Sequence, residues 1–134
     1  MNVLRIGFVG VRTDRVAETT AFFRNVVGLE PLGGTSEKHT ISGLPTGSWD
    51  FVEVFAPDFD DERLISPEVD GVFIAFFVED LEEARRDCEA AGVEILGETV
   101  WAAEAFDKPE YAGVGWFFVR GPDANVYVFQ QTVD

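Results

Sequence analysis

The chain contains few of the side chains that commonly bind metal ions or act as nucleophiles. Cys88 is its only cysteine and His39 its only histidine. An internal disulfide and a site with two histidine ligands are therefore both excluded. His39 lies in a predicted hairpin near residues 37–40, where we expect an exposed or partly packed side chain. Cys88 has no activating neighbour, so we expect a small core residue rather than a reactive thiol.

Three predicted strands carry phenylalanine side chains at alternate positions, interrupted by a few polar ones. Residues two apart share a face of a strand. The three sets are Phe8, Gly10 and Arg12; Phe51, Glu53 and Phe55; and Phe73, Ala75 and Phe77. If these faces enclose a cavity, it has aromatic walls, one carboxylate and one guanidinium, which is typical of a small-molecule site. The alternative is a cavity packed shut by the same rings.

Glu53 favours the open cavity, because a carboxylate facing an apolar interior is costly unless it is paired, hydrogen-bonded or wetted. Arg12 is its expected partner by location. Trp49, Trp101, Tyr111 and Trp116 are candidates for the rim. Their flat rings are suited to stacking on an aromatic ligand or holding a cationic one.

Composition limits the classes of partner. The 134 residues are 46% hydrophobic and have a net charge of −15, with no visible basic patch. Nucleic acid and anionic membranes are poor partners for such a chain, whereas a cationic small molecule would be attracted. No apolar stretch approaches the ~20 residues of a membrane span, and we expect a cytoplasmic protein.

The order of predicted elements occurs twice, as expected for a repeat of two βαβββ modules. The modules cover about 1–57 and 71–134, joined by a linker at about 58–70, within a single domain 1–134. Helices are expected near 16–28 and 81–92, with Asp14 and Asp80 as N-caps. Gly28 and Gly92 are expected to end them. Short strands are predicted at about 30–34, 38–43, 49–56, 93–99, 113–120 and 125–131.

The repeated order has familiar landmarks in FFRNVVGL at 22–29, VEDLEEA at 78–84 and GPDANVYV at 121–128. With these landmarks the chain resembles the vicinal oxygen chelate superfamily. That group contains glyoxalase I, extradiol dioxygenases, fosfomycin-resistance enzymes and bleomycin-resistance proteins. The resemblance implies an α+β fold in which two βαβββ modules form incomplete barrels around a cavity, and it implies a homodimer.

The resemblance also locates the expected metal ligands. Metal-dependent members place His or Gln in the first strand of each module and Glu in the last strand of each. The landmarks put Phe8 and Phe73 at the first pair of positions, and Glu53 and Val128 at the second. Hydrocarbon side chains cannot donate electron pairs to a divalent cation. We therefore expect no catalytic metal and no cofactor, as in the bleomycin-resistance branch.

Three functions follow as hypotheses. The first is a metal-free binding protein that sequesters a planar aromatic or cationic compound, such as an antibiotic. The second is a cofactor-independent isomerase, cyclase or lyase with Glu53 as the catalytic acid or base. The third is an interaction module for a partner protein. The predicted ligand-binding residues are Phe8, Arg12, Trp49, Phe51, Glu53, Phe55, Phe73, Phe77, Trp101, Trp116 and Val128.

Overall fold

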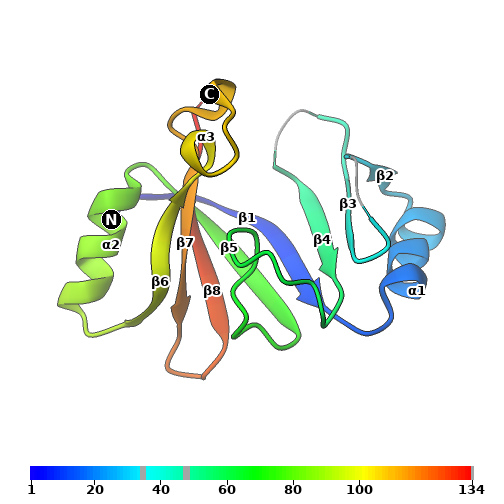
Figure 1. Ribbon diagram of the computed structural model, residues 1–134, viewed down its shortest axis with the longest axis horizontal. Coiled ribbons are helices and arrows are strands. Elements are labelled where there is room, and N and C mark those ends of the chain that lie inside the picture. The colour runs from blue at the N-terminus through cyan, green and yellow to red at the C-terminus, as the bar shows by residue number, and fades with distance from the viewer. Residues whose placement is uncertain (34–35, 47–48, 134) are drawn as a thin grey trace.

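Eight strands form one mixed sheet in the computed structural model, which describes residues 1–33, 36–46 and 49–133. Their order across the sheet is β2-β3-β4-β1-β5-β8-β7-β6. The strands are β1 (Val3–Arg12), β2 (Glu30–Pro31), β3 (His39–Gly43), β4 (Phe51–Phe55), β5 (Val72–Val78), β6 (Glu94–Trp101), β7 (Gly115–Arg120) and β8 (Val126–Gln131). Figure 1 shows the curved sheet with a helix at each end.

The two halves of the sheet have the same internal order. In each half the first strand pairs in parallel with the last, β1 with β4 and β5 with β8, and the outer strands continue antiparallel. The halves join through the antiparallel pair of β1 and β5. This arrangement confirms the α+β fold of two βαβββ modules, and the sheet does not close into a barrel.

The two helices that follow the first strand of each half cover the face of the sheet opposite to the linker. Helix α1 (Val16–Ala21) continues as a π-helix, η1 (Phe22–Val27), and α2 (Leu81–Ala90) lies in the second half. Asp80 caps α2 as predicted by accepting a hydrogen bond from the Glu83 amide, at 3.1 Å. The N-cap of α1 is Arg15, with no side-chain cap bond, so the Asp14 prediction was wrong. No helix in the described ranges is long and apolar enough to span a membrane.

The apolar side of α2 packs on strands of the second half. Leu81, Ala84 and Cys88 are buried in one cluster with Phe117 and Val119 of β7. Burial raises the pKa of the Cys88 thiol, as expected for a core residue. The first helix packs in the same way, because Val16 is buried against Val54 of β4.

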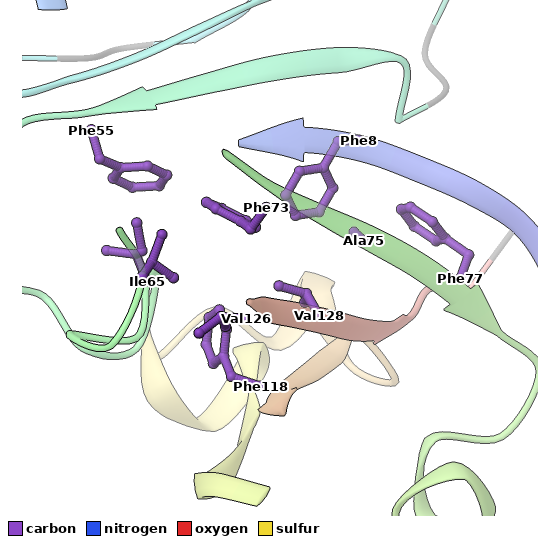
Figure 2. Packing of buried hydrophobic residues seen from close by; sticks show 10 residues of the cluster. Phe8, Phe55, Ile65, Phe73, Ala75, Phe77, Phe118, Val126 and Val128 are labelled. Carbon is purple, nitrogen blue, oxygen red and sulfur yellow. The ribbon is translucent and has the colours of Figure 1, made fainter. Parts of the chain in front are cut away.

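The other face of the sheet carries the largest apolar cluster (Figure 2). It joins Phe8 of β1, Phe73 and Phe77 of β5 and Val128 of β8 to Ile65, which comes from the linker. Figure 2 shows Ile65 at one end of this cluster and Phe77 at the other. The linker therefore folds back over one end of this face and leaves the rest of it for a cavity.

Arg12 holds the linker in this position. Its Nη1 donates to the carbonyl oxygens of Ala56, Pro57 and Phe59, at 3.0, 3.2 and 3.2 Å, and its Nη2 donates to Ser66 O at 3.3 Å. Backbone carbonyl groups in a folded-back segment need donors, and a guanidinium supplies several from one point. Arg12 is thus a structural residue at the end of β1.

We predict that Arg12→Met lowers the free energy of unfolding by about 2 kcal/mol, because several linker carbonyl groups lose their donor. Urea unfolding followed by circular dichroism measures the change. Arg86→Met is the matched control, since Arg86 is exposed on α2 and should change stability by less than about 0.5 kcal/mol. Equal effects of the two substitutions would contradict the role given to Arg12.

Candidate functional site

A cavity of about 860 Å³ opens on the linker side of the sheet. Strands of both halves form its floor, and the segment 102–114 with α3 (Ala102–Ala105) and η2 (Pro109–Tyr111) forms part of its wall. Its lining residues are Phe8, Leu32, His39, Ile41, Leu44, Pro45, Trp49, Phe51, Glu53, Leu64, Phe73, Ala102, Phe106, Lys108, Tyr111, Val114, Trp116, Phe118, Val128 and Gln130. The cavity is therefore open rather than packed shut.

Aromatic rings make the floor. Phe8 stacks on Phe51, with ring centres 4.8 Å apart, and meets Phe73 edge to face at 6.2 Å. Trp49 adds a tilted contact to Phe51 at 5.8 Å. Gly10 permits this packing, because a Cβ there would lie 2.0 Å from Cζ of Phe73. Rings that hold one another in fixed orientations offer a preformed flat surface to a ligand.

Glu53 is hydrogen-bonded to His39 at the edge of this floor. His39 Nε2 and Glu53 Oε2 are 2.7 Å apart, and the two side chains are only 14% and 13% exposed. The His39 ring also stacks on Phe55, at 4.4 Å between centres and 8° between planes. The pair is thus held in place, and it can carry a proton between an imidazole and a carboxylate.

The sequence prediction paired Glu53 with Arg12, and this pairing was wrong. The last residue of β1 turns toward the linker, so Arg12 meets backbone carbonyl groups instead. His39 was missed as a site residue, although the hairpin register would have located it. His39 faces Phe55 and Ile41 faces Glu53 across β3 and β4, so His39 is a diagonal neighbour of Glu53.

Seven of the predicted ligand-binding residues line the cavity: Phe8, Trp49, Phe51, Glu53, Phe73, Trp116 and Val128. The other four lie elsewhere in the part of the chain that the structure describes. Phe55 and Phe77 are buried toward opposite ends of the same cluster, at 0% and 3% exposure, and do not line the cavity (Figure 2). Trp101 packs with the α2 cluster and borders a different, acidic hollow, and Arg12 contacts the linker.

The cavity contains charges of both signs. Besides the pair of Glu53 and His39, its lining includes Lys108, whose Nζ lies 5.9 Å from the ring centre of Tyr111. Gln130, at 2% exposure, adds an uncharged amide. The sequence prediction identified neither Lys108 nor Gln130. Lys108 lies outside the strands, whereas alternation from the predicted residue Val128 along β8 would have located Gln130. The lining therefore has no strong excess of negative charge, unlike the whole chain.

The residues at the four positions of the expected metal ligands do not fit a divalent ion. Phe8, Glu53, Phe73 and Val128 all line the cavity, but only Glu53 carries a donor atom. Across the described residues no group of three or more His, Cys, Asp or Glu side chains could hold a metal ion. Among the donor side chains that the structure describes in the lining, only Glu53 and His39 are shown in contact with each other, and two ligands are too few for the sites that such ions form.

An open mixed sheet of two βαβββ modules around an apolar cavity defines the class of fold. The sequence profile of the Glyoxalase/Bleomycin resistance protein/Dioxygenase superfamily matches residues 5–126. The chain belongs to this superfamily. No curated protein has a significant sequence match to it.

Solved structures share the fold at low sequence identity. A glyoxalase/bleomycin resistance protein/dioxygenase superfamily member from Vibrio splendidus 12B01 is 20% identical over 95% of this chain and 97% of its own, with a TM-score of 0.61. Methylmalonyl-CoA epimerase from Mycobacterium tuberculosis is 16% identical over 98% and 90%, with a TM-score of 0.67.

The Mn(II)-bound glyoxalase from Novosphingobium aromaticivorans is 20% identical over 97% of this chain and 39% of its own, with a TM-score of 0.71. Similarity at this level establishes the fold, which these proteins combine with different activities. The function of this chain must therefore be argued from its own cavity.

We predict that His39 and Glu53 stabilise each other by about 1 to 2 kcal/mol, since each is mostly buried and satisfies the other. A double-mutant cycle with His39→Leu and Glu53→Leu, measured by urea unfolding at pH 7, gives the coupling energy. Lys38 and Asp58 form a matched exposed pair, at 51% and 69% exposure, and should couple by less than about 0.5 kcal/mol. Equal coupling in both cycles would contradict this account of the pair.

Proposed function

We propose that this protein binds a planar aromatic small molecule in the cavity and sequesters it without chemical change. The observation that carries the proposal is the preformed floor of Phe8, Phe51, Phe73 and Trp49 in an open cavity. A volume of about 860 Å³ lies within the range of drug-sized ligand sites. Resistance to an aromatic antibiotic is one role that such binding would serve.

The lining favours a neutral ligand over a cationic one. Glu53 already has a partner in His39, and Lys108 would repel a second positive charge. The negative charge of the whole chain acts at a distance and is screened by salt, whereas the groups of the lining act at contact. A flat neutral compound gains burial and stacking with no such repulsion.

We predict that Trp49→Leu weakens binding of 2-naphthol about tenfold, through loss of one stacking surface. Quenching of tryptophan fluorescence or calorimetry measures the affinity. Trp101→Leu is the matched control, because Trp101 lies outside the cavity, and it should leave affinity within about twofold once folding is verified. Failure of the wild-type protein to bind 2-naphthol or any similar flat compound would contradict the proposal.

A second candidate function is proton transfer without a metal. The hydrogen bond between His39 Nε2 and Glu53 Oε2 favours it, because a paired imidazole and carboxylate in an apolar cavity can act as acid and base. Lys108, rather than Arg12, is the lining cation that would stabilise developing negative charge. Isomerisation, cyclisation and lyase chemistry all begin with such a transfer.

The two candidates differ in how they depend on Glu53. We predict that wild-type protein leaves 2-acetylnaphthalene unexchanged in D2O, and that Glu53→Gln weakens its binding only a fewfold. Proton NMR of the acetyl methyl group follows the exchange. Deuterium incorporation by the wild-type protein that Glu53→Gln abolishes, with binding retained, would instead establish proton transfer.

A further inference from the structure

Gln130 is a polar side chain in the wall of an otherwise apolar cavity. The residue lies on β8 two positions after Val128, on the same face of the strand, and both line the cavity. It is 2% exposed. Its side-chain amide makes no hydrogen bond to any residue that the structure describes. Among the described residues only Arg12 Nε is both fully buried and without a partner, so the unpaired Gln130 amide keeps its small accessible surface, and the surface that it lines is that of the cavity. An amide that makes no bond within the fold and reaches the cavity is available to a ligand.

The neighbouring residue shows what a structural glutamine does on this strand. The Gln131 Oε1 atom accepts a hydrogen bond from the Leu81 amide at 2.8 Å, and its Nε2 donates to Gly113 O at 2.9 Å. Both ends of that amide join parts of the fold on the opposite face of β8. The Gln130 amide makes no such hydrogen bonds, so an apolar side chain at this position would stabilise the fold at least as well.

Gln130 lies beside Trp116, the aromatic side chain that is best placed to hold a ligand against the Gln130 amide. It is the direct cross-strand neighbour of Trp116, and both line the cavity. The indole Nε1 of Trp116 donates to Arg63 O, so the ring is held and its polar atom is already used. A flat compound on the Trp116 ring would therefore turn its edge toward the Gln130 amide, because opposed side chains on one face lie close together.

We propose that Gln130 is the polar recognition residue of the cavity, and that the bound compound is a neutral aromatic carboxamide or lactam. This inference rests on the proposed binding function. An amide edge offers one donor and one acceptor, which match the Oε1 and Nε2 atoms of glutamine together. An ammonium group would use only the acceptor Oε1 and leave Nε2 unpaired. A carboxylate would use only the donor Nε2, leave Oε1 unpaired, and be repelled by the negative charge of the protein.

Two probes of the same shape distinguish recognition by Gln130 from the proposed binding of a flat aromatic compound. 2-Naphthamide carries the amide edge, and 2-isopropylnaphthalene replaces that group by a hydrocarbon of similar size. We expect the wild-type protein to bind 2-naphthamide about tenfold more tightly, in calorimetry or fluorescence titration. Gln130→Met should abolish that preference, leave 2-isopropylnaphthalene binding equal or tighter, and leave the melting temperature unchanged or higher.

A second readout does not depend on any variant. In the wild-type protein, the side-chain NH2 resonances of Gln130 should shift on titration with 2-naphthamide and stay in place with 2-isopropylnaphthalene, while those of Gln131 stay in place with both. Equal affinity for the two probes, with no shift at Gln130, would overturn the inference and leave the binding function intact. Binding of neither probe would overturn both.

Discussion

The stack of Phe8 on Phe51, with Phe73 at the edge of Phe8, is the interaction on which the rest of the site depends. These rings come from β1, β4 and β5, so they cross the seam where the two halves of the sheet meet. The seam is also where the superfamily resemblance implies first-strand metal ligands. Burial of these rings stabilises the contact between the two halves, and the same rings form the floor of the cavity. The stability of the fold and the proposed ligand recognition therefore depend on one set of contacts.

The two faces of the sheet have different roles, one in packing against helices and the other in forming the cavity. Helices α1 and α2 pack on one face, where Val54, Phe117 and Val119 are buried against them. The linker covers only part of the other face. Arg12 holds it there by donating hydrogen bonds to backbone carbonyl groups. Because the linker packs at one end of this face through residues such as Ile65, the remainder stays hollow and accessible to a small molecule.

The repeat made the fold predictable, since two runs of the same element order admit few arrangements of strands. Alternation along strands was likewise sufficient for Phe8, Phe51, Glu53 and Phe73, because side chains two apart must share a face. It failed at Arg12, where the strand ends and the side chain turns to the linker. It could not find His39, because the position of a residue across a hairpin depends on register, which alternation alone leaves open.

We propose that this cavity accepts flat organic compounds in place of a metal ion, because hydrocarbon side chains occupy three of the four expected ligand positions. Native mass spectrometry of the protein offered Mn(II) and 2-naphthol together tests this claim directly. We predict a mass increase of one aromatic molecule per chain with no retained metal. One manganese ion retained per chain, lost in Glu53→Gln, with the aromatic compound excluded, would contradict it.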